Sequence, residues 1–151
     1  MMIEDTPWPP HLTVAAIVHR NDRFLMVEEL SDGQQVLNQP AGHLEPGETI
    51  IDALHRETME ETGWQIEPLA ICGIYHYTTK STLYHRLTFV AKALKQVTTK
   101  LDPDITACHW LTLAEISEQP QRSPIVVQCI EDYLDGQSAP LSLLKHLGSR
   151  N

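Results

Sequence analysis

Apolar and polar positions in the first forty residues follow the short period of β-strands. The runs HLTVAAIVH (11–19) and RFLMVEEL (23–30) are rich in apolar and β-branched residues and are separated by Arg-Asn-Asp. This arrangement predicts a β-hairpin. A turn at Asp32-Gly33 then precedes QQVLNQP (34–40), which predicts a short third strand that Pro40 ends.

A helix is predicted after a loop over residues 41–48, which contains two glycines and a proline. Thr49 followed by Asp52 forms a variant capping box, so we expect the helix to begin near Ile50. Gly63 is expected to end it, because glycine readily adopts the left-handed conformation found at helix ends.

The second half of the chain returns to strand patterns and closes with a helix. A bend is expected in its first strand, at Pro68 or Gly73. We expect three strands, at 66–77, 84–94 and 107–113. A single helical turn at 114–118 and a last helix at 124–135 are expected to follow. Strands interrupted by one helix and closed by another predict an α/β fold, a mixed sheet of the α+β type covered by helices. We expect residues 1–151 to form a single domain, with 1–10 as a loose N-terminal tail.

Composition and charge restrict the classes of partner. The chain has 42% hydrophobic and 21% charged residues and a formal net charge of −9, so it carries no general basic field for nucleic acid or an anionic membrane. An anionic substrate would need a local cation, supplied by Arg and Lys or by a metal. The N-terminus lacks a signal-peptide pattern and the cysteines are odd in number, which favours a cytoplasmic protein with buried thiols.

Three carboxylates crowd the predicted helix. Glu57, Glu60 and Glu61 span only about 100° of arc and border the face of Leu54 and Thr58, which is expected to be buried. Like charges at this spacing repel, and glutamates near a helix C-terminus oppose its dipole. A solvated, glutamate-rich helix end is the ordinary alternative. Clustered hard oxygen ligands instead favour a Mg²⁺ or Mn²⁺ site.

The same residues resemble the Nudix box. The spacing of Gly42, Glu48, Arg56-Glu57, Glu60-Glu61 and Gly63 is similar to that signature. Thr58 departs from it, because the family usually has a bulky aliphatic residue there, and Trp64 fills the final apolar position. The stretches LNQPAGHLE, VAAIVH, FLMVEE and RSPIV are further similar to those of a bacterial subgroup, the NudJ-type phosphatases.

The resemblance implies an α/β/α sandwich with a catalytic loop-helix-loop and a divalent cation, Mg²⁺ with Mn²⁺ as a substitute. It implies that Glu57, Glu60, Glu61 and the Gly42 carbonyl bind this metal. Glu48, Arg56 and Gly63 would be structural. We expect a Glu48–Arg56 salt bridge, with Arg56 pointing away from the three carboxylates of the helix. The candidate catalytic residues are Glu60, Glu57 and, outside the box, Asp104 with Asp102 second; a turn is the alternative for the two aspartates.

Substrate contacts are predicted from polar residues near the same loop. Arg86 lies in an apolar strand, where a cation either faces a ligand, such as a phosphate, or forms a structural ion pair. Asn38 and Gln39 are expected to contact a base or a phosphate, and His43 either contacts substrate or is solvent-exposed. Two further expectations concern other sites. Arg122 is expected to cap the last helix, with a substrate contact as the alternative, and His76 and His85 are expected to pack across neighbouring strands, with a zinc site as the alternative.

The combined hypothesis is a Mg²⁺-dependent hydrolase of phosphoanhydride bonds. The resemblance implies nucleoside di- and triphosphates or related compounds, such as thiamine-pathway pyrimidine pyrophosphate, as substrates of a monomer or homodimer. A non-catalytic Nudix domain that binds a nucleotide as a sensor or scaffold is the main alternative. An isoprenoid diphosphate isomerase would be expected to carry a cysteine just before the box, and residues 31–41 contain none.

Overall fold

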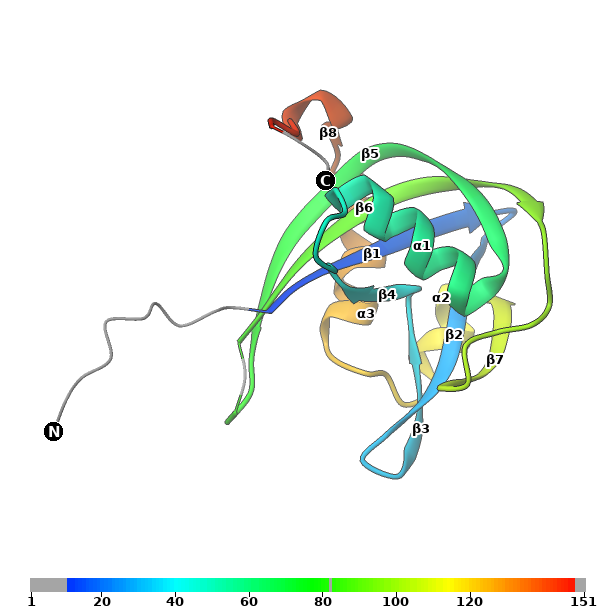
Figure 1. Cartoon of the computed structure of the whole chain (residues 1–151). Helices are drawn as coiled ribbons and strands as arrows, with labels where there is room; N and C mark the ends of the chain where they lie inside the picture. Colours follow the sequence, from blue (N-terminus) through cyan, green and yellow to red (C-terminus); the bar gives the residue numbers. More distant parts are fainter. Residues whose placement is uncertain (1–10, 82, 149–151) are drawn as a thin grey trace, which may run out of the picture.

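The structure, a computed structural model, describes residues 11–81 and 83–148, so the tail expected at 1–10 lies outside the described residues. Figure 1 shows the arrangement of its elements. In chain order these are β1 (His11–Arg20), β2 (Arg23–Ser31), β3 (Gln34–Asn38), β4 (Ala41–His43), α1 (Ile50–Thr62), β5 (Trp64–Thr78), β6 (Leu83–Gln96), β7 (Ile105–Leu111), α2 (Leu113–Ser117), α3 (Ile125–Leu134), β8 (Ala139–Pro140) and the 3₁₀ turn η1 (Leu141–Leu143).

The described strands form a mixed sheet, as the sequence predicts. Its main path runs β3-β2-β1-β6-β5-β8, with β4 paired to β1 and β7 paired to β2. Strands β1 and β6 are parallel, with His11 opposite Tyr84 and Val18 opposite Ala91. The hairpins β1–β2, β2–β3 and β5–β6 are antiparallel.

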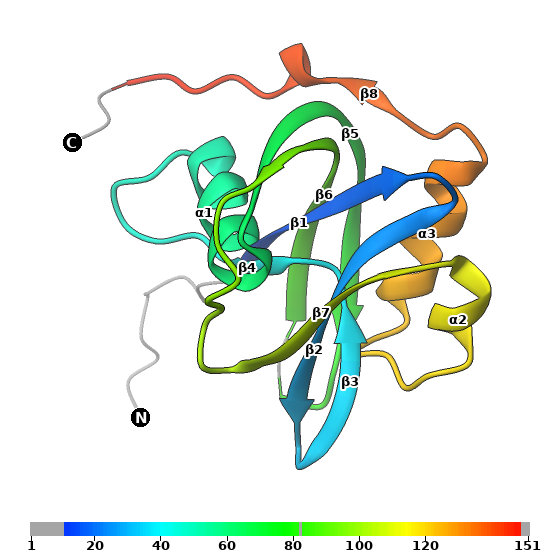
Figure 2. The ribbon, with the colours of Figure 1, turned by 90° about the vertical axis from the view of Figure 1, so that its right-hand side faces the viewer.

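Helices cover both faces of the sheet, which confirms the expected sandwich. Figure 2 shows α1 on one side of the central strands and α2 and α3 on the other. Alternate residues of β1 serve the two layers, since successive side chains of a strand point to opposite faces. Val14 and Ala16 pack beneath α1 with Leu54, whereas Ile17 packs with Val126 of α3. In the part of the chain that the structure describes, no helix is long and apolar enough to cross a membrane.

Helix α1 begins and ends where its caps predict. The Thr49 hydroxyl accepts a hydrogen bond from the Asp52 N–H at 3.1 Å, and the Asp52 carboxylate accepts one from the Thr49 N–H at 3.2 Å. Gly63 ends the helix at a φ of 74°. The unusual Thr58 is fully buried, and its hydroxyl donates to the Leu54 carbonyl at 2.8 Å, so no polar group is left unsatisfied there.

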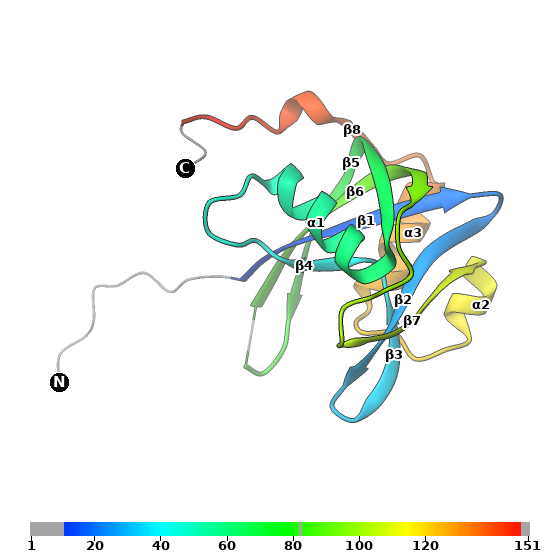
Figure 3. The ribbon, with the colours of Figure 1, turned by 45° about the vertical axis from the view of Figure 1, so that its right-hand side comes forward.

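Three expectations about local structure are wrong. The loop predicted over 41–48 begins with strand β4, which pairs with β1 so that Gly42 lies opposite Val14 (Figure 3). Strand β7 ends at Leu111, before the predicted 113, because the Thr112 hydroxyl caps α2 by accepting from the Glu115 N–H at 3.2 Å. Arg122 does not cap α3, whose first turn is instead bonded by Ser123.

Gly63 is required at the end of α1 for two separate reasons. Its φ is positive, and a Cβ added there would overlap the carbonyl oxygen of Thr98. We expect Gly63→Ala to lower the free energy of unfolding by about 3 kcal/mol, from left-handed strain and overlap together. Urea unfolding measures this difference.

Gly136 provides the matched control, because its φ is also positive but a Cβ there would meet no described atom within 4 Å. Gly136→Ala should cost only about 1 kcal/mol. Equal losses in the two variants would contradict the role given to the Thr98 contact.

Candidate active site

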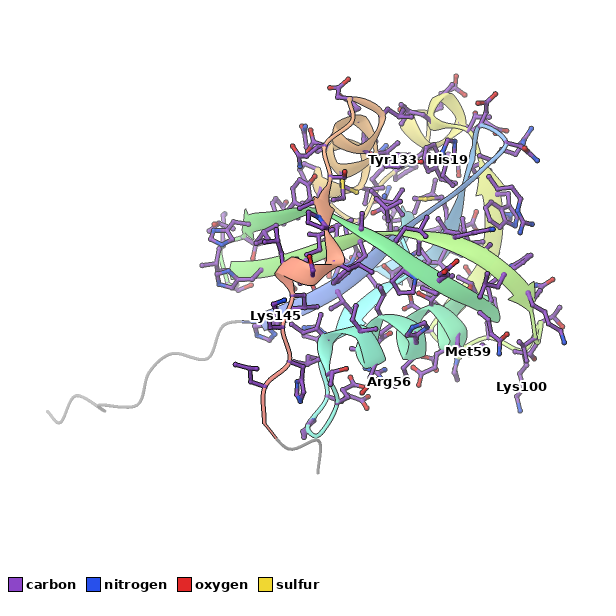
Figure 4. The ribbon with its side chains drawn as sticks, turned by 90° about the horizontal axis from the view of Figure 1, so that it is seen from above. His19, Arg56, Met59, Lys100, Tyr133 and Lys145 are labelled. Carbon is purple, nitrogen blue, oxygen red and sulfur yellow. The ribbon has the colours of Figure 1, made fainter. Side chains whose placement is uncertain are left out.

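One arginine joins the loop to helix α1. The Nε and Nη2 atoms of Arg56 donate to the two carboxylate oxygens of Glu48, at 2.9 and 2.7 Å, and Nη2 also donates to the His43 carbonyl at 3.0 Å. Figure 4 shows Arg56 extending from α1, and these bonds direct it to the preceding loop. The expected Glu48–Arg56 salt bridge is therefore present, in the bidentate form that gives strong and well-oriented pairs.

Arg56 does not point away from the other carboxylates, so that expectation is wrong. Its Nη1 atom donates to Glu57 at 2.8 Å and to Glu60 at 3.3 Å, and lies 3.5 Å from Glu45. A long guanidinium can reach both sideways and along the helix surface, so the position of its Cα does not fix where the charge lies. Glu48 first, and then Glu57, raise the pKa of Arg56, although its burial opposes the shift.

Glu57 is pressed against the backbone of β4. A Cβ at Gly42 would overlap the Glu57 carboxylate, which explains why glycine stands at this position. The Glu57 side chain is only 13% exposed, and burial raises its pKa although Arg56 partly opposes the shift. The side chain of Glu60, by contrast, is 44% exposed.

Glu61 is the most deeply buried of the three glutamates. It is 8% exposed, and its Oε1 accepts a hydrogen bond from the Ala41 N–H at 2.8 Å. Burial raises the pKa of Glu61 to about 9, and the nearby charges of Glu57, Glu29 and Asp102 add to the shift. Without a cation Glu61 is therefore protonated at neutral pH.

The donor set suits a hard divalent cation, although the side chains are not gathered around one point. No three His, Cys, Asp or Glu residues of the described chain converge closely enough to bind a metal ion. Arg56 engages Glu57 and Glu60, and Glu61 is turned to the backbone of β4. Buried, mutually repelling carboxylates would be stabilised by a cation, which is the ligand chemistry of Mg²⁺.

A cavity of about 510 Å³ adjoins β4. Its volume is in the range of small-molecule sites. Strand β4 contributes Gly42 and His43 to its wall, so the cavity and the glutamates meet along this short strand. The charged, amide and aromatic side chains that line it include Glu29, Asn38, Tyr77, Tyr84, Arg86 and Arg122.

Arg86 faces the cavity without a carboxylate partner. It is 5% exposed and donates to Asn38 Oδ1 at 2.9 Å and to Gln39 Oε1 at 3.1 Å, and no ion pair of Arg86 occurs within the described residues. The predicted structural ion pair is thus absent there. Gln39 is 1% exposed, does not line the cavity, and donates to the Val126 carbonyl at 2.8 Å. Gln39 therefore positions Arg86 and does not face a ligand.

The remaining predicted residues fall in different places. His43 lines the cavity and contacts His11 at 3.2 Å, and burial together with His11 lowers the pKa of His43. Asp104 is exposed in the turn before β7, so its catalytic role stays a prediction. Asp102 lies nearer the glutamates, because its N–H donates to the Glu60 carbonyl at 2.8 Å. His76 and His85 contact each other across β5 and β6 at 2.8 Å.

Sequence reasoning missed one cavity residue, Glu29, and favoured a helix cap for another, Arg122. Glu29 accepts a hydrogen bond from Asn38 at 3.0 Å, and Arg122 lies 3.8 Å from Glu29. The available signal was a charged residue at the end of an apolar strand for Glu29, and a cation just before Ser-Pro for Arg122. Neither signal indicates on its own which residues lie opposite in the fold.

Comparison with known proteins identifies the arrangement. The sequence pattern of the NUDIX domain matches residues 9–131. The chain belongs to the Nudix family. It is 39% identical to the phosphatase NudJ of Escherichia coli over 139 residues, which cover 89% of this chain and 90% of NudJ. The chain is also similar to the solved structure of a NUDIX hydrolase from Nitrosomonas europaea. The two are 44% identical with a TM-score of 0.87, over 92% of this chain and 98% of that one.

A more distant structure shares the fold alone. The MutT NUDIX hydrolase of Burkholderia pseudomallei is 18% identical, with a TM-score of 0.69 over 83% of this chain and 98% of that one. The family uses divalent metal ions, and the chain is a NudJ-like Nudix phosphatase or pyrophosphohydrolase of small phosphorylated compounds. The hypothesis of an enzyme is thereby confirmed over that of a non-catalytic domain.

The buried carboxyl of Glu61 gives a Nudix site that is sensitive to pH in the absence of metal. An unfolded glutamate loses its proton near pH 4.5, whereas folded Glu61 retains it to about pH 9. Between these values the folded state binds more protons, so its free energy of unfolding falls as pH rises. In EDTA, Glu61→Gln should exceed the wild type by at least about 1 kcal/mol near pH 8.5 and approach it near pH 5.

Urea unfolding across this pH range measures the difference, with Glu67→Gln, an exposed glutamate of β5, as the control. A constant offset between wild type and Glu61→Gln at every pH would show that Glu61 does not titrate as described.

Proposed function

We propose that this Nudix enzyme hydrolyses phosphoanhydride bonds of nucleoside di- or triphosphates, or of related pyrophosphorylated compounds such as thiamine-pathway pyrimidine pyrophosphate, with Mg²⁺. One observation carries the proposal: Gly42 contacts the Glu57 carboxylate and also lines the 510 Å³ cavity. A phosphate chain at β4 would lie beside the carboxylates while its organic group occupies the cavity.

The metal is assigned to Glu57, Glu60 and Glu61, with the Gly42 carbonyl as a further ligand. These residues would hold a Mg²⁺ ion, which would supply charge neutralisation for phosphate oxygens and polarisation of phosphorus towards attack by water. Glu60 is the most exposed of the three glutamates, so we assign to it the orientation or deprotonation of that water. Arg56 and Glu48 fix the loop against the helix.

Substrate binding is assigned to the cavity side of β4. The chain has a net charge of −9, so attraction for a phosphorylated compound must come from local cations. The proposed metal supplies one for the phosphates, Arg86 and Arg122 line the cavity that takes the organic group, and His43 lies beside Gly42 on the same wall. Asn38 bonds to Arg86 and contacts the substrate either itself or through that arginine. Gln39 also positions Arg86.

Removing the proposed base should stop turnover while leaving the fold intact. We expect Glu60→Gln to lower kcat by about 10²- to 10⁴-fold, the usual contribution of general base catalysis. Paired steady-state assays and thermal scans measure this, with Glu67→Gln as the control. Full activity in folded Glu60→Gln would remove Glu60 from the mechanism.

Magnesium should stabilise the folded protein through the same carboxylates. A ligand that binds only the folded state raises its stability in proportion to RT ln(1 + [L]/Kd). Mg²⁺ should therefore raise the Tm of the wild type by more than that of Glu57→Gln. Equal shifts in both proteins would place the metal elsewhere.

A panel of pyrophosphorylated compounds, assayed with Mg²⁺ and ranked by kcat/KM, tests the substrate assignment. Separate assays for phosphate and pyrophosphate identify the bond that is cleaved. We expect inorganic phosphate from nucleoside triphosphates or from a pyrimidine pyrophosphate. No turnover of any of these compounds with either Mg²⁺ or Mn²⁺ would contradict the proposed function.

A further inference from the structure

Glu29 places a negative charge in the cavity wall, beside a buried arginine. The amide of Asn38 joins the two: its Nδ2 donates to Glu29 Oε1 at 3.0 Å, and its Oδ1 accepts from Arg86 Nη2 at 2.9 Å. Guanidinium groups only donate and an ionised carboxylate only accepts. The orientation of the Asn38 amide is therefore fixed by its neighbours, and it fixes both of theirs.

Both charged groups keep unused hydrogen-bonding capacity. A guanidinium has five N–H donors, and the described contacts of Arg86 use Nη1 for Gln39 and Nη2 for Asn38. Glu29 has a second oxygen, Oε2, besides the one that Asn38 occupies. Its side chain is 20% exposed and lines the cavity, so a ligand there can reach it.

This pairing is unsuited to a phosphate group. A carboxylate beside Arg86 would repel a phosphate placed in contact with both, because two anionic groups would then meet. The phosphates have a better position beside Glu57, Glu60 and Glu61, where the proposed cation binds. A neutral ring with a donor next to an acceptor instead matches Glu29 and Arg86 together. Tyr77 and Tyr84 line the same cavity and offer aromatic surface for such a ring.

We propose that Glu29 accepts a hydrogen bond from an exocyclic amino group of the substrate ring, while Arg86 donates to the adjacent ring nitrogen. The substrate class is then a phosphorylated compound with an amidine edge, as in cytosine or adenine. The inference rests on the proposed function, because it assigns the organic end of the same substrate. In uracil or hypoxanthine the amino group is replaced by a carbonyl, which faces Glu29 without a proton to share, and the neighbouring N–H faces Arg86.

Two matched substrate pairs test this discrimination. We expect the wild type to hydrolyse CTP with a higher kcat/KM than UTP, and ATP with a higher one than ITP, by about tenfold or more in each pair. In Glu29→Gln the amide can rotate and donate to a carbonyl, so both ratios should fall towards one. Glu28→Gln is the control, because Glu28 is the preceding residue of β2, contacts His109 and does not line the cavity.

The outcomes separate the inference from the proposed function. Failure to hydrolyse any of the four nucleotides contradicts both. Hydrolysis of all four with ratios near one in the wild type overturns the inference alone and requires no variant. An equal fall in kcat for all substrates in Glu29→Gln, with unchanged ratios, also overturns it and assigns Glu29 to the neighbouring carboxylates. Dissociation constants of non-hydrolysable CTP and UTP analogues, which do not depend on turnover, should show the same preference.

Discussion

A single guanidinium lies among four carboxylates where the loop before α1 meets the helix. Arg56 contacts Glu45, Glu48, Glu57 and Glu60, and its bidentate bond to Glu48 ties the preceding loop to helix α1. One positive charge cannot balance four negative charges. Because several of these side chains are partly buried, water screens their repulsion only in part. The rest of the site follows from this imbalance. Glu61, which lies outside the reach of Arg56, remains buried and keeps its proton instead.

The short strand β4 joins this charged region to the cavity. Because Gly42 has no side chain, Glu57 can approach the β4 backbone, and the cavity opens along the same strand. A substrate that lies along β4 would therefore meet two different environments. The carboxylates favour a cation, whereas the cavity wall combines a buried arginine with a carboxylate and two tyrosines.

The local parts of this structure were predictable from the sequence, and the long-range parts were not. Helix α1 is specified by residues close in the chain, since Thr49, Asp52 and Gly63 form its caps directly. Strand β4 is only three residues long and depends on pairing with β1, which no local pattern reveals. The orientation of Arg56 was misjudged because its long side chain carries the guanidinium along the helix surface to Glu57 and Glu60, whatever the direction of its Cα–Cβ bond.

The cavity shows the same limit. Arg86 was singled out as a cation in an apolar strand and Asn38 as a polar residue near the glycine loop, but their partners come from other segments of the chain. Glu29 meets Asn38 across a hairpin, and Arg122 approaches Glu29 from the segment before α3. Family resemblance predicted a set of metal ligands but did not predict these cavity residues.

Diffraction from crystals soaked in Mn²⁺, with anomalous scattering to locate the ion, tests the central claim most directly. The account predicts an ion about 2.0 to 2.3 Å from oxygens of Glu57, Glu60 and Glu61, with Arg56 released from Glu57 and Glu60 but still bonded to Glu48. Strong Mn²⁺ density elsewhere, with Arg56 still bridging Glu57 and Glu60, would contradict it.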